Sequence, residues 1–97
     1  MRRFPEKLLA RIRSLPHQET RHAAENKMLL GLSDEDVVSI AETAEWWQTN
    51  KDEKRPGKYK YEMIGRDTYG RRMYTAGKEM TLDGEEIWFI VTIHEAD

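Results

Sequence analysis

The sequence predicts an α+β fold in which N-terminal helices pack on one face of a C-terminal antiparallel β-sheet. Residues 58–97 contain three runs rich in Tyr, Ile, Val, Phe, Trp and Thr, separated by turn signals that contain Gly. Residues 4–44 instead place apolar side chains at helical spacing. The 97 residues are enough for one modest core, so we expect residues 1–97 to form a single domain.

The first predicted helix covers residues 5–15. Pro5 stands in its first turn, where the missing N–H costs no hydrogen bond, and Pro16 ends it. Its apolar stripe consists of Leu8, Leu9, Ile12 and Leu15.

A second helix is predicted from about His17 to Leu30, with Gly31 as a left-handed stop. Its expected buried side consists of Ala23, Ala24, Met28 and Leu30.

A third helix is predicted over residues 34–44, with Ser33 as its N-cap. Acidic residues at 34–36 complement the helix dipole, and this capping role explains them better than a metal site does. The apolar side consists of Val37, Val38, Ile40, Ala41 and Ala44.

Trp46 and Trp47 are expected to form or begin a short first strand, with one ring in the core and the other exposed. Residues 50–57 are polar, charged and closed by Pro-Gly, which predicts a loop. This basic loop either contacts a phosphate backbone or is simply mobile.

The face of the sheet on which each side chain lies follows from the loops between the strands. An even loop of residues 67–70 and a turn at residues 82–84 would put Arg66 opposite Arg71, and Arg71 opposite His94. The expected core face then carries Tyr59, Tyr61, Met63, Tyr74, Ala76, Ile87, Phe89, Val91 and Ile93. The other face mixes polar and apolar residues, as a functional surface does: Lys60, Glu62, Ile64, Arg66, Arg71, Met73, Thr75, Trp88, Ile90, Thr92 and His94. An odd loop or a β-bulge would exchange part of these two faces.

Charge alternates in sign along the chain, and the net charge is −2. Residues 1–31 carry seven Lys/Arg against three Asp/Glu, and residues 51–80 carry nine against five, which makes each segment +4. Residues 32–50 and 81–97 carry five Asp/Glu each and no Lys/Arg. The basic segments are compatible with a polyanionic partner, and equally with an ordinary solvated surface.

The sequence has no cysteine, and its three histidines have no metal-ligand spacing, so we expect neither a metal nor a cofactor. It also has no apolar run of the length that a signal peptide or a membrane span needs. We therefore expect a cytoplasmic protein that does not engage a membrane.

Two stretches resemble the small toxins of the RelE superfamily, including the BrnT-like and MqsR-like groups. The first is HAAENKMLLGLSDEDVVSIAE, and the second combines YEMIGRD, GRRMYTAGK and IWFIVTIHEA; together they cover about residues 21–96. The resemblance implies a RelE-like fold and the toxin half of a toxin–antitoxin pair. Such a toxin is a hydrolase, an endoribonuclease that cleaves mRNA, free or on the ribosome, without a metal. Its partners would be mRNA and a cognate antitoxin protein.

The resemblance maps onto four positions of the face that the strand pattern predicts to be functional: Arg66, Arg71, Thr92 and His94. RNA cleavage without a metal needs a base for the 2′-hydroxyl, an acid for the leaving oxygen and cations for the developing charge. We expect His94 and Glu62 to exchange protons, and Arg71 and Arg66 to hold the phosphate. The RNA-binding residues are expected to be Lys58, Lys60, Arg72, Thr92 and Trp88, the last as a stacking surface.

Two other functions remain open from the sequence. The mixed face also fits a non-catalytic module that binds a protein, for example an inhibitor of phage or defence origin. It fits equally an inactive toxin homologue that keeps only its antitoxin-binding surface. In both cases Lys60 or Arg71 would form a cross-strand ion pair with Glu62.

Overall fold

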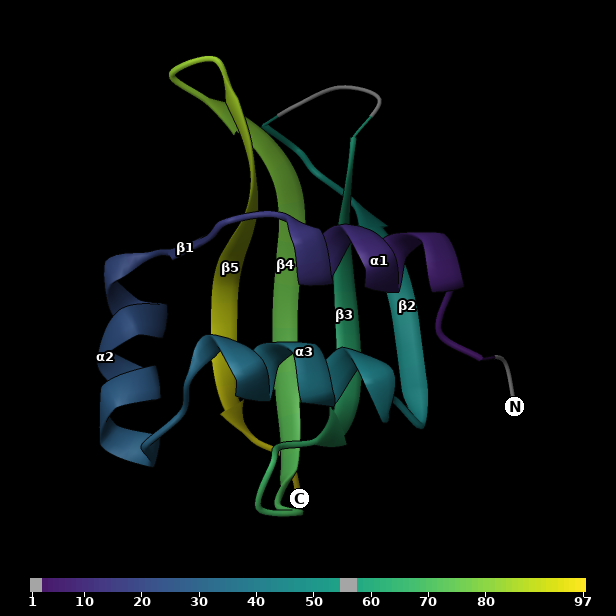
Figure 1. Cartoon of the computed structure of the whole chain (residues 1–97), viewed down its shortest axis with the longest axis vertical. Coiled ribbons are helices and arrows are strands. Elements are labelled where there is room, and N and C mark those ends of the chain that lie inside the picture. Colours follow the sequence, from purple (N-terminus) through teal and green to yellow (C-terminus); the bar gives the residue numbers. More distant parts are fainter. Residues whose placement is uncertain (1–2, 55–57) are drawn as a thin grey trace.

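The computed structural model describes residues 3–54 and 58–97, and it is an α+β fold. Its three helices are α1 (Glu6–Ser14), α2 (Arg21–Leu30) and α3 (Asp34–Glu42). Its strands are β1 (His17–Glu19), β2 (Trp46–Lys51), β3 (Tyr59–Arg66), β4 (Arg72–Leu82) and β5 (Glu85–Glu95). They form one sheet in the order β1-β5-β4-β3-β2 (Figure 1).

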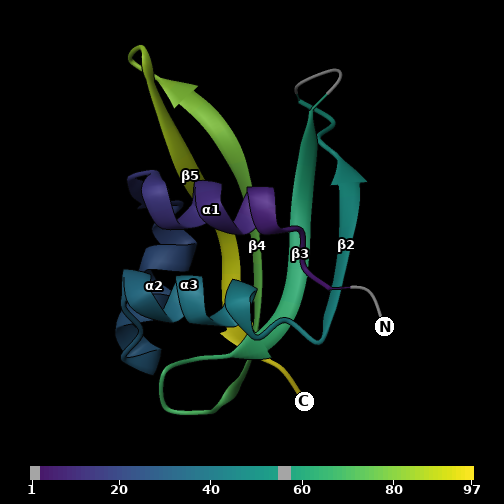
Figure 2. The same cartoon turned by 45° about the vertical axis from the view of Figure 1, so that its right-hand side comes forward.

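The helices gather on one face of the sheet. Figures 1 and 2 show α1 and α3 crossing this face and α2 lying beside β5. We call this face the helix side, and we call the opposite face, which carries no helix among the described residues, the open face. No described helix has the length and apolar character that crossing a bilayer requires.

The sheet is mixed rather than purely antiparallel, because β1 pairs with β5 in parallel. The prediction that the second helix begins near His17 was therefore wrong for residues 17–20. Thr20 is the true N-cap, since its hydroxyl accepts a hydrogen bond from the backbone N–H of Ala23. An N-cap has extended backbone angles, so the residues before it are free to join the edge of the sheet.

Helix α2 ends as predicted, at Gly31 with φ of 68°. Its buried side was predicted less well, because Met28 is 83% exposed. Lys27 is buried instead, and its ammonium group lies 2.7 Å from Asp34 and 3.4 Å from Glu19. The two carboxylates offset the cost of burying that charge.

Helix α3 begins as predicted. The Ser33 hydroxyl accepts from the backbone N–H of Asp36, and the Asp36 carboxylate accepts from the backbone N–H of Ser33, which makes a capping box. Val37, Ile40 and Ala41 are buried, as their spacing predicted.

The core lies between the helices and the sheet. Its buried members are Phe4, Leu8, Ile12, Ala23, Leu32, Val37, Ile40, Ala41, Met63, Met73, Trp88, Ile90 and Ile93. Trp47 packs against this cluster, with its ring edge-on to that of Phe4 and the two ring centroids 5.8 Å apart. Trp46 is instead 40% exposed. This confirms the prediction for the two adjacent tryptophans.

Strand β2 also includes Asn50 and Lys51, which were predicted to begin a loop. The rest of the predicted loop includes residues 55–57, which lie outside the described residues.

The predicted register between β3 and β4 was wrong. Five residues, 67–71, join these strands, so Arg66 pairs with Arg72 and Ile64 with Tyr74. Because the loop has an odd number of residues, each side chain of β4 lies on the face opposite to the one predicted. Met73 and Thr75 are therefore buried, and Tyr74 lies on the open face.

The hairpin between β4 and β5 turns at Asp83 and Gly84, whose positive φ angles of 52° and 79° suit a two-residue turn. The register then shifts at Ala76 and Gly77, because residue 91 is extra on β5. Before the bulge Trp88 and Ile90 face the helices; after it Ile93 does.

This register corrects the predicted core. Tyr61 packs against the core cluster as predicted, but Tyr74, Phe89 and Val91 are only partly buried and do not belong to it. Trp88, predicted on the functional face, is 1% exposed.

Helix α3 approaches β3 closely at Gly65. A Cβ on this glycine would overlap the carbonyl oxygen of Ile40 and lie 3.0 Å from the Thr43 hydroxyl. The backbone of α3 therefore rests directly on the strand.

Two neighbouring substitutions test the observed register. Trp88→Ala removes a core side chain, and we expect it to lower the free energy of unfolding by roughly 3–5 kcal/mol. Phe89→Ala removes a partly buried side chain on the open face, outside the core cluster, so its cost should be clearly smaller. Urea unfolding measures both, and a larger loss for Phe89→Ala would contradict the register.

Candidate functional site

The open face is where the sheet leaves polar and aromatic side chains accessible. Strand alternation together with the register assigns to it Trp46, Gln48 and Asn50 from β2, Lys60, Glu62, Ile64 and Arg66 from β3, Arg72, Tyr74 and Lys78 from β4, and Phe89, Thr92 and His94 from β5. This surface contains six of the nine residues predicted for the site: Lys60, Glu62, Arg66, Arg72, Thr92 and His94.

A polar cluster of Glu62, Tyr74 and His94 lies in the middle of the open face. The Tyr74 hydroxyl donates to Glu62 Oε1. The Tyr74 ring stacks on the imidazole of His94, with ring centroids 4.7 Å apart and an angle of 16° between the planes. Tyr74 makes both contacts because it is paired directly with His94 and lies diagonally from Glu62 across β3 and β4.

Strand β2 completes this cluster. Gln48 Nε2 donates to Glu62 Oε2 at 2.9 Å, and Asn50 Nδ2 donates to the same oxygen. The Glu62 carboxylate thus accepts three side-chain hydrogen bonds, from two neighbouring strands. Such a carboxylate orients its donors, so the geometry favours a positioning role for Glu62.

Tyr74 acts as a donor in this cluster. Burial, followed by the hydrogen bond to the Glu62 carboxylate, raises the pKa of Tyr74 well above its ordinary value of 10. The phenol therefore stays protonated at neutral pH, and it cannot serve as a base.

His94 is exposed, and its ring orientation fixes its chemistry. Nδ1 lies 2.7 Å from the backbone carbonyl oxygen of Glu95. A carbonyl only accepts hydrogen bonds, so Nδ1 carries the proton of the neutral ring, and Nε2 keeps the lone pair that can take another proton. Histidine is also the side chain that exchanges protons near neutral pH.

Two arginines lie two residue pairs beyond Tyr74 along β3 and β4, on the same face of the sheet. Arg66 and Arg72 face each other across β3 and β4. Arg72 Nε lies 2.7 Å from Glu45 Oε1, and its Nη1 donates to the carbonyl oxygen of Asp97. The ion pair with Arg72 lowers the pKa of Glu45. Arg66 Nη1 donates to the carbonyl oxygen of Gly70 at 3.2 Å.

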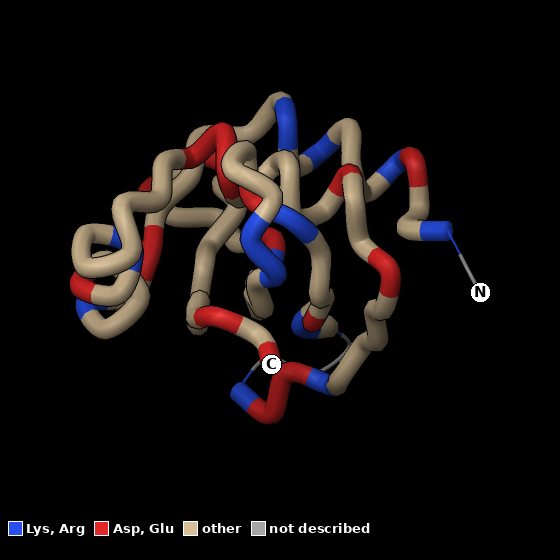
Figure 3. Tube along the Cα trace, turned by 90° about the horizontal axis from the view of Figure 1, so that it is seen from below, with Lys and Arg blue, Asp and Glu red and all other residues tan. Residues whose placement is uncertain are grey.

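On the other side of the cluster lie Lys60 and Lys78. Lys78 Nζ is 2.9 Å from Asp52 Oδ2, and both side chains are nearly buried, at 12% and 5% exposed. Figure 3 marks the Lys and Arg positions and the Asp and Glu positions on the described trace, and positions of opposite charge lie near one another at several places. On the open face, Arg72 and Lys78 thus each have a carboxylate partner.

Three predicted site residues lie elsewhere. Trp88 is in the core, so it offers no surface for a base, and its predicted accessibility was wrong. Lys58 precedes β3 and lines a separate pocket with Tyr59, Tyr61 and Glu79. The predicted pairing of Arg71 with His94 was also wrong, because Tyr74 is the partner of His94.

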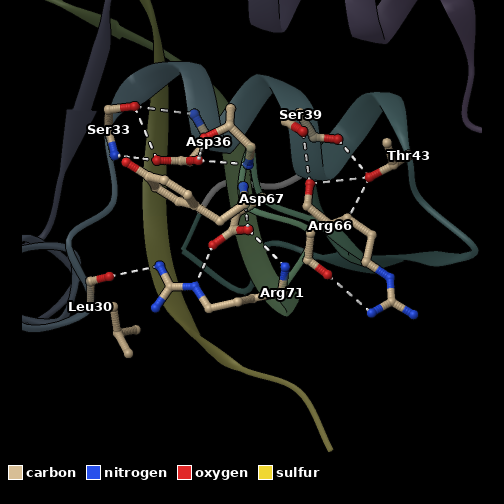
Figure 4. Close-up of polar contacts among 11 residues, drawn as sticks. Leu30, Ser33, Asp36, Ser39, Thr43, Arg66, Asp67 and Arg71 are labelled. Carbon is tan, nitrogen blue, oxygen red and sulfur yellow. Dashed lines mark hydrogen bonds and ion pairs between the residues drawn. The ribbon is translucent and has the colours of Figure 1, made fainter.

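Arg71 belongs to the loop of residues 67–71, which is held by two buried carboxylates (Figure 4). Its Nε lies 2.7 Å from Asp67 Oδ2, and its Nη2 donates to the carbonyl oxygen of Leu30 at 2.7 Å. These two hydrogen bonds from one guanidinium group tie the loop to the end of α2.

Asp36 holds the same loop from α3. Its Oδ1 accepts from the backbone N–H of Thr68 at 2.8 Å and from the Thr68 hydroxyl at 2.7 Å. Burial alone would raise the pKa of Asp36, but the hydrogen bonds from Thr68 and Ser33 outweigh it and lower this pKa below its ordinary value of 3.8.

Sequence reasoning missed Gln48, Asn50, Tyr74 and Trp46 as members of the open face. Alternation from the two tryptophans would have placed Gln48 and Asn50 beside Trp46. No local signal reveals that the loop after Arg66 has an odd number of residues, and this number decides the side of Tyr74.

Among the described residues, no group of three His, Asp or Glu side chains is arranged to hold a metal ion. A search against protein-family models and a search of curated proteins both found no match to this chain.

The role of Asp36 gives a prediction for the pH dependence of stability. Its folded-state pKa lies below 3.8, so the folded protein binds fewer protons than the unfolded chain below about pH 4, and stability should fall as the pH falls through that range. Asp36→Asn should cost roughly 1–3 kcal/mol at neutral pH, and this cost should shrink in acid.

Urea unfolding of both proteins at about pH 7 and about pH 3 measures this effect. Glu35→Gln is the matched control, because Glu35 is exposed in the same helical turn. A cost for Asp36→Asn that does not change with pH would contradict the proposed ionisation.

Proposed function

We propose that the protein is a metal-independent endoribonuclease, the toxin of a toxin–antitoxin pair, that cleaves mRNA on the open face of a RelE-like fold. The observation that carries the proposal is the stacked Tyr74–His94 pair, which holds an imidazole with its Nε2 lone pair available on the same face of the sheet as Arg66 and Arg72. We also propose a cytoplasmic location, where mRNA and ribosomes are found.

In the proposed reaction, the 2′-hydroxyl of a nucleotide attacks the adjacent phosphorus and the bond to the 5′-oxygen breaks. His94 Nε2 takes the proton of the 2′-hydroxyl as general base. The leaving 5′-oxygen takes a proton from a water molecule, because the open face is accessible to solvent, and the hydroxide that forms takes the proton from His94. The products are a 2′,3′-cyclic phosphate and a 5′-hydroxyl end.

The other residues would position the substrate or stabilise charge. Arg66 and Arg72 would bind the phosphate and stabilise its charge as it develops, which replaces the role first assigned to Arg71. Tyr74 holds the imidazole in orientation, and Glu62 holds Tyr74. A cognate antitoxin would neutralise the enzyme by covering this face.

A non-catalytic module that binds a protein is the second candidate. It is favoured by the pairing of Arg72 with Glu45 and of Lys78 with Asp52, since these cations already have carboxylate partners. An inactive toxin homologue would present the same surface.

The test is a cleavage assay on a single-stranded RNA, with and without ribosomes and with excess EDTA. We expect His94→Ala to lower the cleavage rate by roughly 10²–10⁴-fold, the usual range for a general base, and to leave the fold intact because His94 is exposed near the end of β5.

His22→Ala is the matched control, because His22 is an exposed histidine on α2. Full activity of His94→Ala would remove His94 from the mechanism, and activity that EDTA abolishes would overturn the metal-independent reaction. If the unsubstituted protein cleaves under none of these conditions, the binding module becomes the better reading.

A further inference from the structure

Four side chains form a single row across the open face. Trp46 is paired with Ile64, Ile64 with Tyr74, and Tyr74 with His94, so the row crosses β2, β3, β4 and β5. Neighbouring strands lie about 4.8 Å apart, and the row therefore spans roughly 14 Å from Trp46 to His94. Both ends carry a planar ring.

Trp46 presents its ring to the open face. Its neighbour Trp47 packs the other way, against Phe4 in the core, and adjacent residues of a strand point to opposite faces. Trp46 is 40% exposed, while Trp88 is 1% exposed. The exposed indole of Trp46 can therefore serve as a stacking surface. Among the described residues, no aromatic ring contact involves it.

Cations lie on both sides of this row. Arg66 and Arg72 form the next pair on the open face, on the side of the row nearer the 67–71 loop. Lys60, which is paired with Asn50, lies on the other side of the row. The Arg72–Glu45 pair is exposed, at 36% and 41%, so an incoming phosphate can compete with that carboxylate. Lys78 is held in its nearly buried pair with Asp52 and takes no part.

We infer that the substrate of this face is single-stranded RNA laid across the strands, with one base stacked on Trp46 and another at the Tyr74–His94 end. This inference rests on the proposed function, which already takes mRNA as the substrate, and adds to it a binding residue outside the reacting centre and the path of the RNA across the sheet. The phosphates run beside Arg66 and Arg72.

A single strand fits better than a duplex. Stacking needs bases that are not already stacked inside a helix, and a row of rings on an open sheet accepts two or three such bases. A duplex would offer this face only its sugars and phosphates, which leaves Trp46 without a role.

The experiment separates binding from cleavage by using an RNA of about eight nucleotides with 2′-O-methyl groups, which lacks the attacking hydroxyl. Fluorescence anisotropy of the labelled strand gives the affinity, and intrinsic fluorescence reports on Trp46, the most exposed of the three tryptophans. We expect Trp46→Ala to weaken binding between about 5-fold and about 150-fold, the usual effect of one stacked base. Trp46→Phe should keep most of the affinity, because it keeps a ring.

Tyr69→Ala is the matched control, because Tyr69 is an aromatic residue that is 78% exposed on the 67–71 loop. Equal affinity of Trp46→Ala, equally tight binding of a duplex of the same sequence, or no binding at all would each overturn the inference. Binding to the single strand that depends on Trp46, in a protein that cleaves no RNA, would support the inference and defeat the nuclease.

Discussion

The contact between α3 and Gly65 is the constraint on which the arrangement of this molecule depends. The missing side chain lets the carbonyl of Ile40 rest on β3, and the hydroxyls of Ser39 and Thr43 then bond to the backbone of Arg66 at 2.8 Å and 2.6 Å (Figure 4). With α3 fixed this closely, α1 packs beside it through the core and through the ion pair between Arg13 and Glu42. The helices thus share one face of the sheet, and no helix of the described residues covers the other face.

The parts of the fold that could be predicted are those with local causes. Ser33, Gly31 and Pro16 mark helix ends through their own backbone chemistry, and the alternation of Trp46 and Trp47 depends only on strand geometry. Strand β1 could not be found in this way. It has three residues and no periodic pattern, and its hydrogen bonds go to β5, some seventy positions away.

The candidate site was predicted in part because two irregularities compensate each other. The odd loop at 67–71 turned β4 and the start of β5 over, so Tyr74 joined the open face and Trp88 joined the core. The bulge near residue 91 then returned His94 to the side on which it was expected, the side of Glu62. The alternation of side chains therefore predicts faces correctly along an uninterrupted strand. It does not reveal the number of residues in a loop or the presence of a bulge.

The 67–71 loop has a consequence for backbone dynamics. The amides of Thr68, Tyr69 and Arg71 all donate to the carboxylates of Asp36 or Asp67, although Thr68 and Tyr69 are at the surface. Surface loops normally exchange their amide hydrogens rapidly with solvent. Here the exchange should be slow and tied to the opening of two buried carboxylates, so this turn should keep its shape on the time scale of the packed core.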